Sequence, residues 1–145
     1  MPKILSCCTL LLAILLSHTA SARDTRLMLS IADALATPEA KAQLSGDIQF
    51  VFGAEAEGEV DRRFGTFTTN KKTNAFNKTD TEACQWVFLS AMVTLQQRAR
   101  NEGGNAVVNI QSYYKKNQVS STTEFECGAG SFVAGVALRG DVVTL

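Results

Sequence analysis

The sequence has one histidine, His18, and only four cysteines among 145 residues. His18, Cys7 and Cys8 all lie in the first 22 residues, where an apolar run over residues 4–16 precedes small residues that end at Ala22. This order is typical of a signal peptide cleaved after Ala22. An uncleaved anchor is disfavoured because a spanning helix needs about 20 apolar residues, and a lipid anchor because both cysteines precede most of the run. We therefore expect an exported, periplasmic protein.

Cleavage would leave no histidine and two cysteines. Ser-His-Asp and Cys-His catalysis both need an imidazole base, and a structural zinc site needs four ligands, chiefly histidine or cysteine. The sequence also has no Gly-x-x-x-x-Gly-Lys-Ser/Thr run, which the phosphate-binding loop of an ATPase requires. These absences predict that the mature protein is not an enzyme of those classes and that it carries no metal or cofactor.

Charge is balanced over the chain, which argues against nucleic acid as a partner. The sequence has 14 basic and 14 acidic residues, so loss of Lys3 with the signal peptide leaves 13 against 14, a net charge near −1. Such a chain has no overall field that attracts nucleic acid or an anionic membrane. Glu55, Glu57, Glu59 and Asp61 alternate along one segment. We interpret them as a solvated connection, because their spacing does not match a calcium loop.

Cys84 and Cys127 are the cysteines that follow the signal peptide. A lone pair of cysteines in an oxidising compartment usually forms a disulfide. If a helix begins near residue 80 and a strand ends at Cys127, this bond would join helix to sheet. Two separate buried thiols are the alternative. A structural role is favoured, since the sequence places no cationic partner for a reactive thiol near either cysteine.

The best-defined element is a helix over residues 80–102. Thr79 followed by Glu82 forms a capping box, and Gly103 is expected to end the helix. Its middle, residues 86–93, is almost entirely apolar. This pattern predicts that the helix is covered on one side by a sheet and on another by the N-terminal segment or a second subunit.

Alternating hydrophobic residues predict the strands, and Thr37-Pro38-Glu39 predicts the start of one short N-terminal helix. Strands are expected at residues 48–52, 62–69, 105–114, 118–127 and 131–138, with an apolar stretch at 142–145 after an interruption at Gly140-Asp141. Gly65 is compatible with a bulge. The order predicts an α+β fold, a single domain over residues 23–145. In it, one long helix packs on a small, mainly antiparallel sheet of about four to five strands.

The same alternation predicts which way several side chains face. In the strand over residues 118–127, Glu124 and Glu126 are expected to face water while Phe125 and Cys127 face the core. Gly128-Ala129-Gly130 resembles the start of a dinucleotide-binding turn, but a strand pattern rather than a helix follows it, so the motif is not supported. We interpret these small residues as the place where the long helix approaches the sheet closely.

Residues 68–78 are predicted to form a polar loop between a strand and the long helix. Loops held on a rigid scaffold often carry binding functions. Lysines and amides could grip an anionic group or a carbohydrate, with Phe76 as a stacking face. The simpler interpretation is a polar connection in which Phe76 packs at the start of the helix. The candidate binding residues are Asn70, Lys71, Lys72, Asn74, Phe76, Asn77 and Lys78.

Four segments carry a family resemblance: Phe64–Phe76, Ala83–Trp86, Gly103–Ile110 and Glu126–Gly130. They resemble a family of small exported proteobacterial proteins that are often described as an excinuclease ATPase subunit. That description conflicts with this sequence, because a DNA-repair ATPase needs a phosphate-binding loop. The part from Asn105 onward is also similar, more distantly, to the YbjQ-like and RcsF-like folds. The RcsF-like resemblance implies a disulfide that joins helix to sheet, and the YbjQ-like resemblance implies assembly into homo-oligomers.

The sequence therefore predicts a non-enzymatic binding or interaction domain of the cell envelope, whose partner is an envelope protein or glycan. A second hypothesis is a hydrolase that acts on envelope glycans through two of the carboxylates Glu55, Glu57, Glu124 and Glu126. A third hypothesis is an oligomeric structural protein of the envelope.

Overall fold

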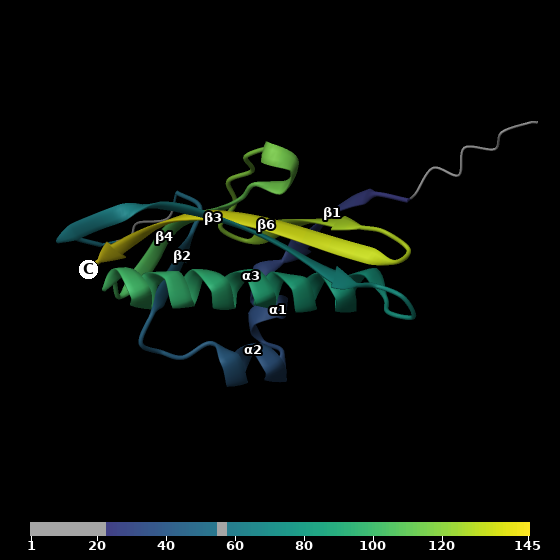
Figure 1. The fold of residues 1–145 in the computed structure, drawn as a ribbon, viewed down its shortest axis with the longest axis horizontal. Coiled ribbons are helices and arrows are strands. Elements are labelled where there is room, and N and C mark those ends of the chain that lie inside the picture. The colour runs from purple at the N-terminus through teal and green to yellow at the C-terminus, as the bar shows by residue number, and fades with distance from the viewer. Residues whose placement is uncertain (1–22, 55–57) are drawn as a thin grey trace, which may run out of the picture.

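The computed structural model describes residues 23–54 and 58–145. The expected signal peptide and the carboxylates Glu55 and Glu57 lie outside the described residues. The predicted α+β fold is confirmed: one long helix lies along one face of a single sheet (Figure 1). The sheet has six strands rather than four to five, because residues 25–30 also form a strand.

The sheet is organised around β6, the last strand among the described residues. One edge of β6 pairs with β3 along its whole length, while the other edge pairs first with β5 and then with β4. β1 extends the sheet beyond β5, and β2 extends it beyond β4; only β2 and β4 run parallel. The strands are β1 (Thr25–Ser30), β2 (Gln49–Phe52), β3 (Arg62–Asn74), β4 (Ala106–Ser112), β5 (Glu124–Ala129) and β6 (Val133–Thr144).

The long helix is α3 (Asp80–Glu102), and both of its predicted ends are confirmed. The Thr79 hydroxyl accepts a hydrogen bond from the Glu82 N–H at 3.1 Å. Gly103 ends the helix with φ 85°, the left-handed conformation that glycine adopts without strain.

Two short helices, α1 (Ile31–Leu35) and α2 (Pro38–Gln43), precede the long one. α2 begins as predicted, with the Thr37 hydroxyl accepting from the Ala40 N–H at 3.2 Å. It lies on the side of α3 away from the sheet (Figure 1). The buried Gln96 of α3 donates to the Gln43 carbonyl at 3.1 Å, which holds the end of α2 to the long helix.

The core lies between α3 and the sheet. Phe88 of α3 stacks on Phe125 of β5, with ring centroids 4.2 Å apart, and on Phe52 of β2 at 6.2 Å. The apolar middle of α3 is thus covered by the sheet on one side, and the N-terminal segment contributes to a second side through α1. Trp86 is the exception, with 47% of its surface exposed.

Cys84, near the start of α3, forms a disulfide with Cys127 of β5, and their Cα atoms are 5.9 Å apart. The predicted pairing is confirmed, and the chain is a disulfide-stabilised domain. Both residues are completely buried in the core. Because neither sulfur atom is exposed, an exchanging thiol cannot reach the bond in the folded protein. Its role is therefore structural: it joins α3 to the sheet.

The predicted strand over residues 118–127 is wrong in its first half, because β5 begins only at Glu124. The Ser121 hydroxyl accepts hydrogen bonds from the N–H groups of Thr123 and Glu124, at 3.2 and 3.0 Å. A side chain that bonds nearby backbone competes with the strand ladder. Only Val119 bridges to another strand, opposite Ser112.

The predicted interruption at Gly140-Asp141 is also wrong, because β6 continues through both residues. Gly140 lies opposite Phe67 of β3, and a Cβ atom there would be 2.7 Å from a methyl carbon of Val107. The glycine therefore makes room for a neighbouring strand's side chain. Of the two alternatives that the sequence left open at Gly65, the structure has the bulge: the pairing of β3 with β6 shifts between Arg63 and Gly65, which has φ 140°.

The interpretation of Gly128 as a contact for the helix is wrong. A Cβ atom at Gly128 would lie 2.0 Å from the hydroxyl oxygen of Tyr114. Tyr114 begins the short helix η1 (Tyr114–Lys116), which lies over the face of the sheet opposite α3 (Figure 1). The absence of a side chain at Gly128 thus makes room for Tyr114. Strand alternation alone does not reveal this contact.

Glu126 does not face water, contrary to the prediction, whereas Glu124 does. Glu126 is only 4% exposed; its N–H donates to the Ser112 hydroxyl at 2.9 Å, and its carboxylate lies 3.6 Å from the Arg26 guanidinium. The neighbouring strand β1 supplies Arg26, and the end of β4 supplies Ser112. Arg26 thus lies beside the carboxylate and Ser112 bonds the backbone of Glu126, so the residue lies among neighbouring segments and not in solvent.

Candidate functional site

Most of the predicted binding loop is a strand. Asn70 to Asn74 belong to β3, and each is paired with a residue of β6, up to Asn74 opposite Val133. The prediction of a loop is wrong for these residues, because β6 provides a pairing partner that is distant in sequence. Only Ala75 to Thr79 connect β3 to α3.

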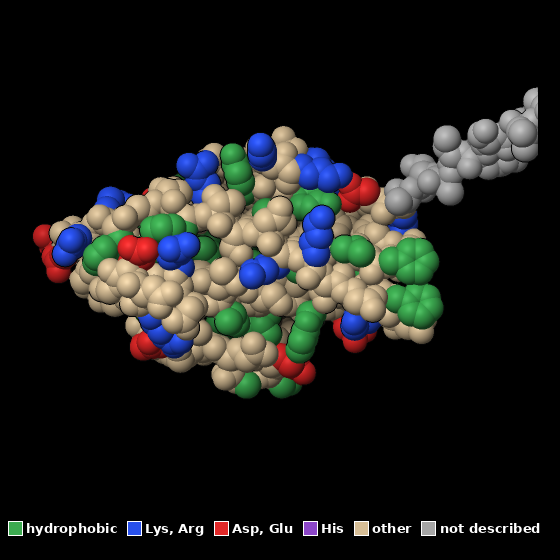
Figure 2. All heavy atoms as spheres, in the orientation of Figure 1, with side chains coloured by type: hydrophobic (Ala, Val, Ile, Leu, Met, Phe, Trp, Pro, Cys, Tyr) green, Lys and Arg blue, Asp and Glu red, His purple; other side chains and the backbone are tan. Residues whose placement is uncertain are grey.

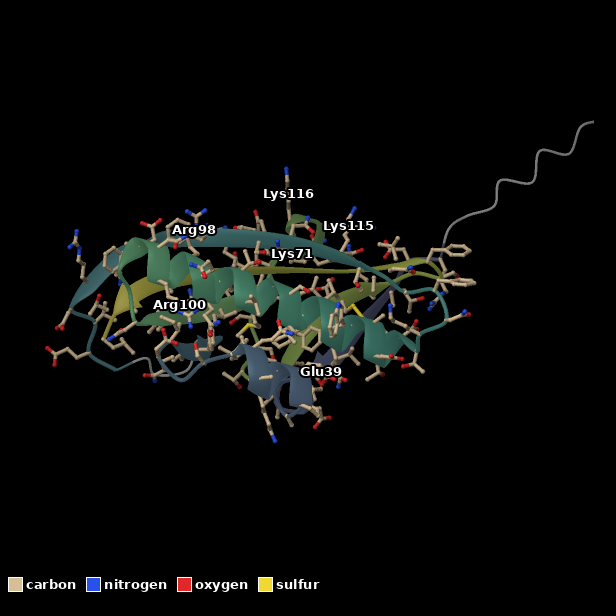
Figure 3. All side chains as sticks on the ribbon, turned by 60° about the horizontal axis from the view of Figure 1, so that its bottom comes forward. Glu39, Lys71, Arg98, Arg100, Lys115 and Lys116 are labelled. Carbon is tan, nitrogen blue, oxygen red and sulfur yellow. A yellow bond between two sulfur atoms is a disulfide. The ribbon has the colours of Figure 1, made fainter. Side chains whose placement is uncertain are left out.

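The two adjacent lysines of this segment lie on opposite faces of the sheet. Lys71 pairs with Val136, a residue of the core beneath α3, whereas Lys72 pairs with Gly135, against which Tyr114 packs on the other face. Successive strand residues alternate between faces. Lys71 and Lys72 therefore cannot grip one small ligand together. Figure 3 shows Lys115 and Lys116, from η1, projecting away from α3.

The connection after β3 is a tight turn that uses its own polar groups. The Asn74 side-chain oxygen accepts a hydrogen bond from the Phe76 N–H at 2.8 Å, and the Lys78 ammonium donates to the Asn74 carbonyl at 2.8 Å. Asn77 has φ 60°, a left-handed conformation that asparagine tolerates better than most residues. The polar side chains of Asn74 and Lys78 thus stabilise the turn, and Phe76 projects from it.

Phe76 forms an exposed stacked pair with Phe132. The ring centroids are 5.8 Å apart with an interplanar angle of 13°, yet the residues are 56% and 66% exposed. Phe132 comes from the turn between β5 and β6, and Val133 beside it is half exposed. Figure 2 shows this hydrophobic patch at the end of the molecule where the described residues begin. The ring contact of Phe76 is thus with another turn.

The turn that carries Phe132 is held to the start of α3 by Arg23. The Arg23 guanidinium donates to both carboxylate oxygens of Asp80, at 2.8 and 2.9 Å, and to the Gly130 carbonyl at 3.1 Å. The bidentate contact with Arg23 lowers the pKa of the Asp80 carboxyl. One side chain therefore ties together the three segments that surround the aromatic pair.

An open groove of about 720 Å³ adjoins the aromatic pair. We call this surface the aromatic end; its residues are Lys72, Thr73, Asn74, Phe76, Phe132 and Val133. Three of the seven predicted binding residues, Lys72, Asn74 and Phe76, lie in it. Phe132 is not among the predicted binding residues. The strand expected over residues 131–138 includes it, whereas β6 begins at Val133 and leaves Phe132 in the turn.

The aromatic end can stack and hydrogen-bond, but it holds no catalytic set. Two ring faces and one ammonium group suit an apolar or anionic group of a partner. Within residues 23–54 and 58–145 no cluster of three or more histidine, cysteine, aspartate or glutamate side chains could hold a metal ion. Of the carboxylates in the hydrolase hypothesis, Glu124 is exposed and Glu126 is buried beside Arg26.

A second hollow, of about 410 Å³, lies around Trp86. Trp86 was predicted as part of a covered apolar stretch, and only the arrangement of the short helices shows that it borders a groove. The lining residues are Thr37, Glu39, Lys78, Glu82, Gln85, Trp86 and Leu89. Glu39 is labelled on α2 in Figure 3.

No protein family, curated protein or solved structure matches this chain. Among the residues that the structure describes, none of the helices combines the length and the apolar character needed to cross a bilayer. The functional argument therefore rests on the surfaces described above.

Proposed function

We propose that this protein is an exported, non-enzymatic binding domain of the cell envelope and that it contacts a partner protein through the aromatic end. The observation that carries the proposal is the stacked pair of Phe76 and Phe132, each more than half exposed. Exposed aromatic clusters on otherwise polar surfaces mark interaction sites, because burying them in a complex removes a large apolar area from water.

The scaffold around the pair supports the same proposal. Arg23 fixes the turn of Phe132 to the start of α3, and the disulfide fixes α3 to β5. A rigid presentation reduces the entropy lost on binding. Export is supported by the apolar N-terminal run and by the disulfide, which persists in an oxidising compartment. Cleavage after Ala22 would leave Arg23, and with it these contacts, in the mature chain.

Site-specific photocrosslinking in intact cells tests the proposal. A photoreactive residue at Ser131, beside Phe132, should give a discrete adduct with a protein, and the adduct should weaken strongly when Phe76 and Phe132 are both changed to alanine. The matched control is the same probe at Gln97, an exposed residue of α3. Equal adducts at both positions, or an adduct indifferent to the loss of both rings, would show that the aromatic end is not the contact surface.

The chemistry of the adduct separates a protein from a glycan. Mass spectrometry of the purified adduct should identify peptides of a second protein, and digestion of peptidoglycan should leave the added mass in place. An adduct that contains no peptides of a second protein and loses its added mass on peptidoglycan digestion would overturn the choice of a protein partner. Intact mass under non-reducing conditions checks export in the same cells, since cleavage after Ala22 predicts a chain beginning at Arg23 with one disulfide.

A further inference from the structure

β3 is a long strand with one open edge. It spans Arg62–Asn74, and among the described residues it pairs only with β6. Open strand edges present unpaired N–H and C=O groups, and natural proteins usually shorten, cover or bend them. The bulge at Gly65 disturbs only the beginning of β3, so the register from Gly65 to Asn74 is regular.

The register shows which backbone groups point outward. The Ala75 N–H donates to the Phe132 carbonyl at 2.8 Å, so it points toward the β6 side of β3. Ala137 is the residue of β6 opposite Asn70. Its carbonyl accepts from the Tyr113 N–H at 2.8 Å, so it points away from β3. In an antiparallel ladder these directions alternate from residue to residue. The backbone groups of alternate residues, Thr66, Thr68, Asn70 and Lys72, therefore point away from β6 toward the open edge.

The segment that contains this edge is strongly basic, although the chain as a whole is neutral. Residues 62–78 contain five lysines and arginines and no aspartate or glutamate, although the whole sequence has a net charge of +0. Neither Lys71 nor Lys72 forms an ion pair with any described residue. Because they lie on opposite faces, positive charge borders the open edge on both sides.

We infer that the open edge of β3 binds an extended acidic segment of the partner protein as an additional strand, which ends at the aromatic end. The inference rests on the proposed function and specifies the chemistry of that partner. Added strands gain affinity from main-chain hydrogen bonds and specificity from alternate side chains. Lys72 lines the groove beside Phe76 and also borders the edge, so the two surfaces are continuous.

Charge argues against a second copy as the occupant. Pairing of two β3 edges would bring two basic segments together with no carboxylate between Asp61 and Asp80 in either one. Like charges on adjacent strands destabilise their pairing, whereas opposite charges stabilise it. An acidic strand meets the lysines on both faces and satisfies the same backbone groups.

Peptide binding to the purified, disulfide-bonded protein tests the inference. The probe is a fluorescent peptide of sequence Thr-Glu-Val-Glu-Thr-Glu-Val, and the comparison peptide has lysine in place of each glutamate. At low salt the acidic peptide should bind at least about tenfold more tightly, with the preference declining as salt is added. Equal binding of the two peptides would overturn the acidic partner.

The variant Asn70→Pro removes one N–H from the open edge and leaves the pairing with β6 intact, because proline is tolerated on edge strands when its missing N–H faces outward. It should weaken the acidic peptide about fivefold to tenfold, the effect of one lost hydrogen bond. Asn70→Ala removes the same side chain, keeps the N–H and should bind normally. Unchanged affinity in Asn70→Pro, with native circular dichroism, would show that the peptide does not add to β3.

Two further comparisons keep the outcomes distinct. Lys72→Glu should weaken the acidic peptide, while the same charge change at Lys41 of α2 should not. Suppose that the envelope adduct is lost when both rings are replaced, but that Asn70→Pro binds the peptide and the partner normally. This combination would overturn the strand addition and leave the proposed function standing. A dimer in sedimentation that Asn70→Pro abolishes would instead identify a second copy as the occupant.

Discussion

The disulfide between Cys84 and Cys127 closes a loop with a sequence separation of 43 residues. In the chain-entropy treatment, a loop of this length stabilises the folded state by about 4 kcal/mol through the entropy that it removes from the unfolded chain. A domain of this size shifts its Tm by roughly 4 °C per kcal/mol. Loss of the bond should therefore lower the Tm by about 15 °C.

Substitution and reduction separate loop closure from packing. Both cysteines are completely buried, so a Cys84→Ala/Cys127→Ala variant loses the bond and two sulfur atoms from the core. Reduction of the unfolded wild-type protein, followed by refolding with reductant present, breaks the bond and keeps both sulfur atoms. We expect reduction to account for most of the total loss, and the remainder measures the packing of the sulfur atoms.

Urea unfolding and thermal circular dichroism at neutral pH, each with and without reductant, measure both effects. The m-value should rise on reduction, because an uncrosslinked unfolded chain exposes more surface. The double alanine variant serves as control, since reductant should not change it. A reduced protein whose Tm stays within about 3 °C of the oxidised one, less than 1 kcal/mol, would refute the loop-closure reasoning.

Three other predictions concern packing and charge. Phe88→Ala should lower the free energy of unfolding by about 3–5 kcal/mol, because it empties the centre of the aromatic stack; urea denaturation measures it, and a loss below about 1 kcal/mol would contradict the packing. Gly128→Ala should cost about 1–3 kcal/mol, because its Cβ meets the Tyr114 ring, and adding Tyr114→Ala should remove most of that clash. Because Arg23 lowers the pKa of Asp80, their contact contributes stability above the ordinary aspartate pKa of about 4 and loses it as the pH falls toward the lower, folded-state value. Asp80→Asn should therefore show a smaller fall in Tm between pH 6 and pH 3 than the wild type, and an equal fall would contradict this role.

The features that the sequence predicted correctly depend on local chemistry. A capping hydroxyl at Thr79 and a glycine at residue 103 determine the ends of α3 through backbone groups only a few residues away. The disulfide was predictable because only two cysteines follow the expected signal peptide. The bulge at Gly65 likewise follows from the conformations that glycine alone adopts without strain.

The features that could not be predicted from the sequence depend on neighbours that are distant along the chain. Asn70 to Asn74 have polar loop composition, and they form a strand because β6 offers a partner along its full length. Glu126 alternates correctly with its neighbours and is still buried, because strand β1 supplies Arg26 beside it. The aromatic end joins two turns that are far apart in the sequence, so the spacing of Phe76 and Phe132 carries no signal.

The position of β6 constrains when this chain can fold. Its residues 133–144 follow β3, β4 and β5 in the chain and pair with all three of these strands. The three strands therefore lack their shared partner until β6 has been synthesised, and the pairing of β3 and β4 with it then closes contacts of long sequence separation, which are slow to form. Before β6 is present, the three strands that it joins have no common partner, so the described sheet as a whole can form only after that strand is available.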